Sequence, residues 1–493
     1  MSDEKTAADA DEKTRGLLRA ALARGRAGAA PRLMREHCLA PERRPGGIVV
    51  QRLMLAPEAH EGDEHAVPVV LVHSDDARGD GARPLICFMH GTGGDSEGLL
   101  ETHLVPFAKR GYCALGVDAP CHGRRLDPAP EAKIPPPEAK SPSSSRTPDD
   151  ADGLAASLRA PSGHVSLSRS RSETFERYGA ALVAAWRGAS EPPERSAAER
   201  SAAERSAADS SPIRHSGHSG SARPFLFDGA WDCLRAVRFA TGLSNRDGRT
   251  TVGDPKGPDG VALPTRAASG NEPPLDLVDV NVDATRVGVS GVSLGGMYAW
   301  LAAAAAPETI AAAAPLIGAQ DFGWALRNER WRARVDSLPP ALFRAAERDE
   351  RETRGNGDER TSPREVSPEL VERVYDAICP GLTTFLDGPR TFPLVAPRPM
   401  LIVNGELDPR NPLEGVRGLV AATRRAYESK KKTKNFVAVA QRGVAHACTP
   451  QMLALADAWL DWRLRPAAAF CDGNRAEAAV AEALRDAETW LEL

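Results

Sequence analysis

The chain has 493 residues, of which 42% are apolar, 26% are charged and only 5% are aromatic, and its net charge is −4. This near balance of charge gives no electrostatic reason to expect nucleic acid or an anionic membrane as a partner. No apolar run approaches the roughly 18 residues that a membrane-spanning helix needs. The composition therefore speaks against a basic nucleic-acid binder and against a membrane-embedded protein.

The eight cysteines are scattered, and no two of them have C-x-x-C spacing. Such usage favours reduced core thiols over a disulfide framework. The segment Met1–Lys5 contains two acids, unlike a secretory signal peptide. Because Leu17–Leu33 is basic and free of acids, organellar targeting stays open beside a cytoplasmic location, which is the default expectation.

Short apolar runs, bounded by turn residues, recur at the intervals that an α/β domain requires. From the third run onward they are continuous rather than alternating, which is typical of parallel strands covered by helices on both faces. The sequence therefore predicts an α/β fold with a mostly parallel, eight-stranded sheet. The predicted strands are Ile48–Leu55, Val67–Val72, Pro84–Met89, Tyr112–Val117, Arg286–Ser290, Ala312–Ile317, Met400–Val403 and Phe436–Ala440. The predicted helices include Asp95–Arg110, Asp228–Thr241, Leu294–Ala306, Leu413–Ser429 and Met452–Leu464.

Three segments interrupt this pattern: 124–224, 245–277 and 348–365. The first is rich in Pro, Ser, Arg and Ala, and it repeats ERSAA three times in tandem over Glu194–Ala208. Such composition cannot bury enough apolar area to offset the entropy of ordering it. An island within it, Glu173–Trp186, has the spacing of an amphipathic helix that could cap the site. Its apolar positions are Phe175, Tyr178, Leu182 and Trp186.

Each interruption falls between predicted core elements, where insertions cost little stability. We therefore expect one catalytic domain over residues 47–464 with long insertions, and two folded domains are the less favoured alternative. Residues 1–46 are expected to be an N-terminal extension that is partly disordered. Residues 465–493 are expected to form a helical tail.

The most informative motif is Gly291-Val292-Ser293-Leu294-Gly295, between a predicted strand and an Ala-rich predicted helix. In a G-x-S-x-G elbow the serine occupies a strained strand-to-helix turn, so that its hydroxyl projects above the sheet. Side chains two positions before and after it would collide with neighbouring backbone, so Gly291 and Gly295 fit both places. Ser293 is the candidate nucleophile, and a serine that merely starts a helix is the alternative.

A serine hydroxyl becomes a good nucleophile when a histidine accepts its proton and an acid orients that histidine. Asp408 and His446 each follow a predicted strand, at the carboxyl edge where α/β sheets build their sites. The chain order Ser, Asp, His is the one expected with this elbow. Glu406 and Asp321 are the rival acids, and His122 is the rival histidine.

The oxyanion that develops during acyl transfer needs two backbone N–H donors. One is expected from Leu294, the residue after the nucleophile, at a helix N-terminus. The other is expected from Thr92, in the loop that begins at His90 after the third strand, where Gly91 and Gly93 let the backbone approach a substrate. A plain glycine-rich turn is the alternative. A dinucleotide-binding loop is excluded because G-x-G-x-x-G would need glycine where Ser96 stands.

Together these motifs resemble the α/β-hydrolase superfamily, on the side of the dienelactone-hydrolase-like, acetyl-xylan-esterase-like and prolyl-oligopeptidase-type catalytic domains. The resemblance covers roughly 67–464 without the insertions. It includes Asp118–Arg124, which looks like the D-x-x-x-H-G-R turn of those enzymes, and Phe227–Asp232, similar to the start of their helix ahead of the elbow. Serine at position 293 departs from the dienelactone branch, whose elbow normally holds cysteine.

The resemblance implies an α/β-hydrolase fold and a serine esterase that acts on a small-molecule ester through Ser293, His446 and Asp408, with no metal and no cofactor. Phe322 and Trp324, after the sixth predicted strand, either line an acyl or alcohol pocket or pack a cap helix. An acyltransferase or a prolyl-oligopeptidase-like peptidase with the same residues stays open, and so does a non-catalytic binding protein of this fold. The sequence sets no oligomeric state.

Overall fold

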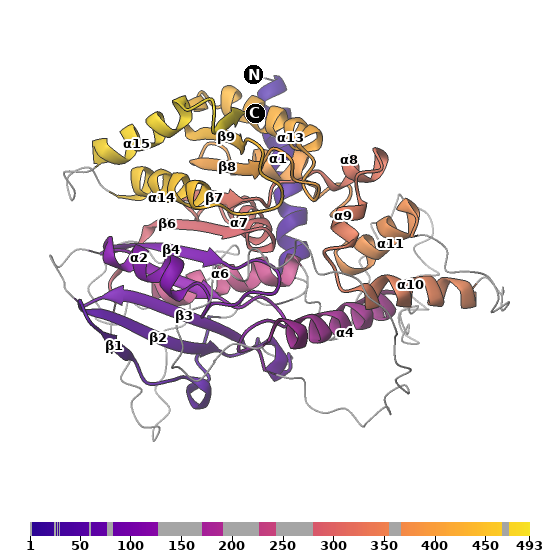
Figure 1. Cartoon of the computed structure of the whole chain (residues 1–493), viewed down its shortest axis with the longest axis horizontal. Coiled ribbons are helices and arrows are strands. Elements are labelled where there is room, and N and C mark those ends of the chain that lie inside the picture. The colour runs from indigo at the N-terminus through magenta and orange to yellow at the C-terminus, as the bar shows by residue number, and fades with distance from the viewer. Residues whose placement is uncertain are drawn as a thin grey trace.

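The computed structural model describes residues 2–23, 26, 28, 30–58, 61–75, 82–126, 170–190, 226–242, 280–353, 366–465 and 473–493. Most of the three predicted insertions, including the ERSAA repeat, lies outside these residues. The described parts form one mixed sheet with helices on both faces (Figure 1).

The sheet has ten strands in the order β1-β2-β3-β5-β4-β6-β7-β8-β9-β10. Its centre, from β5 to β9, is parallel, whereas β1, β2 and β3 on one side and β10 on the other pair antiparallel with their neighbours. Apart from the short edge strands β1 and β10, the remaining strands run 1-2-4-3-5-6-7-8 in sequence order, which is the order of the α/β-hydrolase fold. The bounds are β1 Glu42–Arg44, β2 Ile48–Leu55, β3 Val67–Ser74, β4 Arg83–Met89, β5 Cys113–Val117, β6 Val282–Val292, β7 Ala312–Leu316, β8 Met400–Gly405, β9 Phe436–Gln441 and β10 Trp490–Glu492.

All eight predicted strands are present, and the sheet has two strands more than predicted. The additional strands have three residues each. Strands this short carry no readable alternation, and pairing with β2 or β9 decides their conformation.

Helices cover both faces of the sheet, and each face has its own core cluster (Figure 1). Side chains alternate along β4: Leu85, Cys87 and Met89 join one cluster, whereas Ile86 and Phe88 join the other. This double burial explains why the strand reads as an unbroken apolar run. The first cluster includes α1 (Ser2–Ala23), α6 (Leu226–Gly242), α7 (Leu294–Ala305) and α13 (Leu413–Ser429). The second includes α2 (Val105–Lys109), α14 (Pro450–Leu464) and α15 (Gly473–Arg485).

The predicted helix Asp95–Arg110 is only partly formed. A turn comes first, then a π-helical segment, η3 (Leu100–Leu104), and the α-helix α2 begins at Val105. Two carboxylates hold the turn, because Asp95 accepts a hydrogen bond from the Gly98 amide at 2.7 Å and Asp118 accepts one from the Ser96 amide at 2.7 Å. Local side-chain bonds of this kind compete with a helix start.

A group of helices, here called the cap, lies beyond one end of the sheet (Figure 1). The predicted amphipathic island is a helix of this cap, α4 (Arg171–Ser190), which packs against α10 (Pro340–Thr353) and α11 (Pro368–Ile378). Tyr178, Leu182 and Trp186 of α4 are buried, and the Trp186 indole donates to the Asp349 carboxylate at 3.1 Å. The other cap helices are α8 (Phe322–Arg327), α9 (Arg332–Val335), α10 (Pro340–Thr353) and α11 (Pro368–Ile378). Further short helices are η1 (Arg35–His37), η2 (Asp63–His65), α12 (Gly388–Thr391), η5 (Phe392–Val395) and η6 (Thr433–Asn435).

The N-terminal extension is tied to the domain. Leu18 and Leu22 of α1 are fully buried, and the Arg19 guanidinium donates to the Ala305 carbonyl at the end of α7 at 2.7 Å. The predicted C-terminal tail contains the helix α15 and also the edge strand β10, so it is not purely helical.

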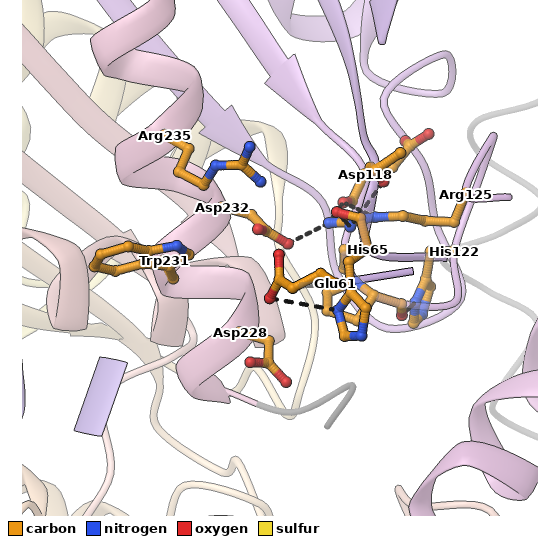
Figure 2. A network of polar contacts seen from close by, with 12 residues as sticks. Glu61, His65, Asp118, His122, Arg125, Asp228, Trp231, Asp232 and Arg235 are labelled. Atoms are coloured by element: carbon orange, nitrogen blue, oxygen red, sulfur yellow. Dashed lines mark hydrogen bonds and ion pairs between the residues drawn. The ribbon is translucent and has the colours of Figure 1, made fainter. Parts of the chain in front are cut away.

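A buried polar network joins the N-terminal part of the chain, the loop after β5 and helix α6 (Figure 2). Arg125 forms an ion pair with Asp232 and donates to the Asp118 carbonyl at 2.9 Å. Arg26 bridges Glu61 at 2.6 Å and Asp228 at 2.8 Å. Buried charges persist when they are paired and hydrogen-bonded, as these are, so the network fixes the position of the loop after β5.

The described cysteines are free thiols, including Cys87 and Cys233, whose sulfurs lie 3.6 Å apart in a thiol hydrogen bond and not in a disulfide. Cys471 lies outside the described residues. Within the described residues there is no helix with both the length and the apolar character needed to cross a bilayer.

Candidate active site

Ser293 lies at the sharp turn between β6 and α7, with φ +56° and ψ −109°. Most side chains avoid this backbone region, and such strain persists only where the surroundings enforce it. The turn is so tight that both flanking positions must be glycine. A Cβ at position 295 would lie 2.2 Å from the Met89 carbonyl oxygen, and one at position 291 would lie 2.6 Å from the Gly295 carbonyl carbon. The Ser293 hydroxyl therefore stands at the carboxyl end of the central strand.

The structure brings Ser293, His446 and Asp408 into one chain of hydrogen bonds. The Ser293 hydroxyl lies 2.8 Å from His446 Nε2, and His446 Nδ1 lies 2.7 Å from an oxygen of Asp408. Since a carboxylate only accepts, Nδ1 carries the ring proton and Nε2 is free to accept from the hydroxyl. The imidazole is therefore in the tautomer that can remove the serine proton.

Asp408 is held rigidly in an ionised state. It is 2% exposed and accepts hydrogen bonds from the Arg410 amide at 2.8 Å and from the Asn411 side chain at 2.9 Å. Burial alone would raise the pKa of Asp408, but the hydrogen bond and charge of His446 and the backbone amides outweigh it, so that the pKa is lowered. The carboxylate can therefore stabilise an imidazolium.

The pKa of His446 is lowered. Burial is the largest cause, and the positive charges of Arg410 and Arg334 act in the same direction. The hydrogen bond and the charge of Asp408 raise the pKa and offset these effects in part. At neutral pH the imidazole is therefore mostly in its neutral form, which is the form a general base needs.

The rival residues lie elsewhere. Glu406 accepts from the Gly443 amide at 2.9 Å, and Asp321 caps α8 by accepting from the Trp324 amide at 2.7 Å. His122 is buried between the rings of His90 and Tyr178.

The loop after β4 lies directly against the elbow. A Cβ on Gly91 would be 3.3 Å from the Val292 carbonyl oxygen and 3.8 Å from Ser293 Cβ. Within the described part of the chain, neither the Thr92 nor the Leu294 amide donates a hydrogen bond. Both amides are therefore free to donate to another group, one in the residue after Ser293 and one in the residue after Gly91, and their role as oxyanion donors stays a prediction.

His90 orients this loop. Its Nε2 accepts from the Ala119 amide at 2.9 Å, so Nδ1 carries the proton and donates to the Gly91 carbonyl at 2.8 Å. This bond turns the Gly91 carbonyl toward the ring of His90. Gly93 follows with φ +82°, a left-handed conformation that glycine adopts without strain.

The two candidate pocket aromatics point to different neighbours. Phe322 is buried edge-on against Tyr375, and the Arg334 guanidinium lies 5.0 Å from its ring centre. Trp324 is half-buried and lies against Gly415 of α13, where an added Cβ would be 2.8 Å from the indole.

Sequence reasoning missed Arg334, Arg410 and Asn411. Arg410 and Asn411 lie two and three residues after the candidate acid, so their position in that loop was an available signal. Arg334 gives no local signal, because its place in the site depends on how α9 packs. In the described residues no group of three or more His, Cys, Asp or Glu side chains could hold a metal ion.

No family model matches the chain, and no curated protein sequence matches it. Among solved structures it is similar to the acetyl xylan esterase from Paenibacillus sp. R4, with 14% identity and a TM-score of 0.45 over 92% of this chain and 95% of that one. It is also similar to acetyl xylan esterase 1 from Thermoanaerobacterium sp. JW/SL YS485, with 11% identity and a TM-score of 0.40 over 91% of this chain and 92% of that one. A third similar structure is a carbohydrate esterase family 15 glucuronoyl esterase from Caldicellulosiruptor kristjansonii. Its identity to this chain is 14% and the TM-score is 0.38, over 88% of this chain and 79% of that one. This chain's own strand order, rather than these likenesses, defines its fold.

Proposed function

We propose that the protein is a serine hydrolase that cleaves a carboxylic ester through an acyl-enzyme, with Ser293 as nucleophile, His446 as general base and acid, and Asp408 as the group that orients the imidazole. The observation that carries the proposal is the continuous chain of hydrogen bonds, 2.8 Å from Ser293 to His446 and 2.7 Å from His446 to Asp408. A binding protein of this fold has no need of a strained serine aligned with a neutral imidazole.

The proposed reaction has two steps. In the first, the Ser293 oxygen attacks the ester carbonyl while His446 takes the hydroxyl proton, and the Thr92 and Leu294 amides donate to the oxyanion that forms. The tetrahedral intermediate collapses, and the leaving alcohol departs with the proton from His446. In the second, His446 removes a proton from water, which attacks the acyl-enzyme and releases the acid and free Ser293.

An acyltransferase would use the same residues and pass the acyl group to an alcohol or thiol instead of water. Product analysis with p-nitrophenyl acetate and competing alcohols separates the two activities. Acid as the main product supports the hydrolase, and transfer products at low alcohol concentration would contradict it.

The test of the proposed function is a chain-length panel of p-nitrophenyl esters on the wild type and two serine variants. Ser293→Ala is expected to lower kcat by about 10³-fold or more, because the covalent route is lost. Ser429→Ala, at an exposed serine at the end of α13, is the matched control and is expected to keep wild-type rates. Full turnover by Ser293→Ala would contradict the proposal.

A further inference from the structure

Three arginines from separate segments lie close to residues of the candidate active site, and we call them the arginine cluster. Arg334 belongs to α9, Arg410 follows Asp408 in the loop after β8, and Arg171 is the first residue of α4. None of them takes a proton in the proposed reaction, so the reaction itself does not explain why they gather here.

Arg334 is fixed beside the elbow. Its guanidinium donates to the Asn411 side-chain oxygen at 2.6 Å and to the Arg410 carbonyl at 2.9 Å. Its Nη1 lies 3.6 Å from the sulfur of Met297, whose amide donates to the Ser293 carbonyl. Because sulfur is a weak acceptor, this edge of the guanidinium keeps most of its donor capacity. This edge therefore lies against the side chain of Met297, which is one turn of α7 beyond Ser293.

The other two arginines lie near the loops on which the candidate site is built. A Cβ on Gly93, in the loop of the proposed oxyanion donors, would lie 3.5 Å from Arg171 Nε. The charge of Arg410 interacts with those of Asp408 and Arg171, and it also acts on His446. Arg334 and Arg410 therefore act on the candidate triad through the charge of His446, and Arg171 lies against the loop that carries the proposed donor Thr92.

Arg334 and Arg410 are not paired with a carboxylate within the described residues. Asp408 is occupied by His446, Asp336 is exposed, and Asp387 accepts from the Phe322 and Gly323 amides. Burial is the largest cause that acts on the pKa of both arginines and lowers it, and the charge of Asp408, with that of Asp387 at Arg334 and of Asp336 at Arg410, offsets it only in part. Gathered cations are costly unless an anion joins them.

We propose that the ester substrate carries a carboxylate within a few atoms of the scissile bond, and that Arg334 and Arg410 bind it, with Arg171 adding to the positive field. This inference rests on the hydrolase function proposed above. Guanidinium groups pair with planar carboxylates through parallel hydrogen bonds, and a singly charged group costs less to desolvate in a half-buried site than a doubly charged phosphate does. The preferred substrates are therefore short esters with one free carboxylate.

The test compares charged and neutral esters of the same skeleton. Monomethyl glutarate is paired with dimethyl glutarate for a carboxylate on the acyl side, and acetoxyacetate with methyl acetoxyacetate for the alcohol side. In the wild type kcat/KM is expected to be about 10- to 100-fold higher for the charged member of at least one pair, and salt should reduce this preference.

Substitutions of single arginines test which side chain causes the preference for charged esters. Arg410→Gln is expected to reduce the charged-to-neutral ratio of kcat/KM about tenfold or more, and Arg410→Lys to restore part of it. Arg417→Gln, at an exposed arginine of α13, is the control and should leave the ratio unchanged. Binding is a second readout that needs no turnover. The Ser293→Ala protein should bind glutarate more tightly than the uncharged glutaramide in calorimetry, and Arg410→Gln should remove the difference.

The outcomes separate the two proposals. Equal kcat/KM for charged and neutral esters, or glutarate binding that Arg410→Gln leaves intact, overturns the carboxylate site while the hydrolase stands. Tighter binding of a phosphate-bearing ester than of glutarate also overturns it. Glutarate binding through Arg410 without hydrolysis of any ester would support the anion site and contradict the hydrolase.

Discussion

Each of Ser293, His446 and Asp408 has surroundings that suit one step of acyl transfer. The φ of +56° directs the Ser293 hydroxyl away from the sheet, and the His446 ring keeps Nε2 open toward it. Asp408 receives three hydrogen bonds besides that of His446, two from backbone amides and one from Asn411. The acid is thus ionised and immobile before any substrate binds.

The lowered pKa of His446 sets the expected pH dependence. Because the neutral imidazole is the base, kcat/KM should rise with pH through an apparent pKa below the ordinary 6.5 of histidine and stay level above it. Protonation of the imidazole removes activity as pH falls through that value. A pH profile of kcat/KM with a neutral ester checks this, and an acid limb centred above pH 7 would contradict it.

Asp408→Asn tests the acid separately. The amide keeps the shape of the side chain but removes the charge that favours the imidazolium and the correct tautomer, so kcat should fall about 10⁴-fold. The same change removes contributions that raise the His446 pKa, so the acid limb should move to lower pH. Unchanged kcat, or a limb that moves to higher pH, would show that Asp408 does not orient His446.

At the scale of elements, the loop after β4 and the elbow depend on each other. The loop is placed by His90, which links the Gly91 carbonyl to the Ala119 amide in the segment after β5. The buried network around Arg125 holds that segment in turn. His90 is thus a positioning residue for the proposed donor Thr92.

His90→Gln is expected to lower kcat about 100-fold with little change in KM, because a misplaced oxyanion donor weakens only the transition state. His37→Gln, in the short helix η1, is the control and should keep wild-type kinetics. Steady-state kinetics with a neutral ester give both parameters. A rise in KM at constant kcat would assign His90 to substrate binding instead.

The elbow also makes a prediction about stability. Gly295→Ala should lower the free energy of unfolding by about 1–3 kcal/mol, since its Cβ would meet the Met89 carbonyl at 2.2 Å. Gly418→Ala, in α13 with nothing within 4 Å, should instead raise it by about 0.5–1 kcal/mol. Urea unfolding measures both. A free energy of unfolding that Gly295→Ala leaves unchanged would mean that the turn is looser than the structure shows.

The central strands could be predicted from sequence because burial on both faces leaves unbroken apolar runs such as Leu85–Met89. The edge strands could not, since Glu42–Arg44 is a strand only through its pairing with β2. Ser293, Asp408 and His446 could be proposed because each lies in the turn or loop that follows a readable strand. Arg334 could not, because tertiary packing of a short helix, rather than local pattern, brings it to Met297.

At the scale of the whole molecule, the polar network of Figure 2 joins the N-terminal segment to the catalytic edge of the sheet. Arg125 and Asp232 are both almost fully buried, and their pair bridges the loop after β5 and α6. Removing one partner leaves an uncompensated buried charge, which costs more than the pair contributes.

Asp232→Asn is therefore expected to destabilise the fold by about 3 kcal/mol in urea unfolding. Glu414→Gln, which removes an exposed pair with Arg330 at 3.9 Å, is the control and should change stability by less than about 1 kcal/mol. Equal effects of the two substitutions would show that the network does not hold the N-terminal segment and the loop together.

The most direct test of the central claim is covalent labelling with a fluorophosphonate, followed by mass spectrometry of the digested protein. A single adduct on the peptide that contains Ser293, formed far more slowly in His446→Ala, is the result expected if the hydroxyl and the imidazole act together. No adduct on that peptide, or labelling at an undiminished rate without the imidazole, would contradict the account.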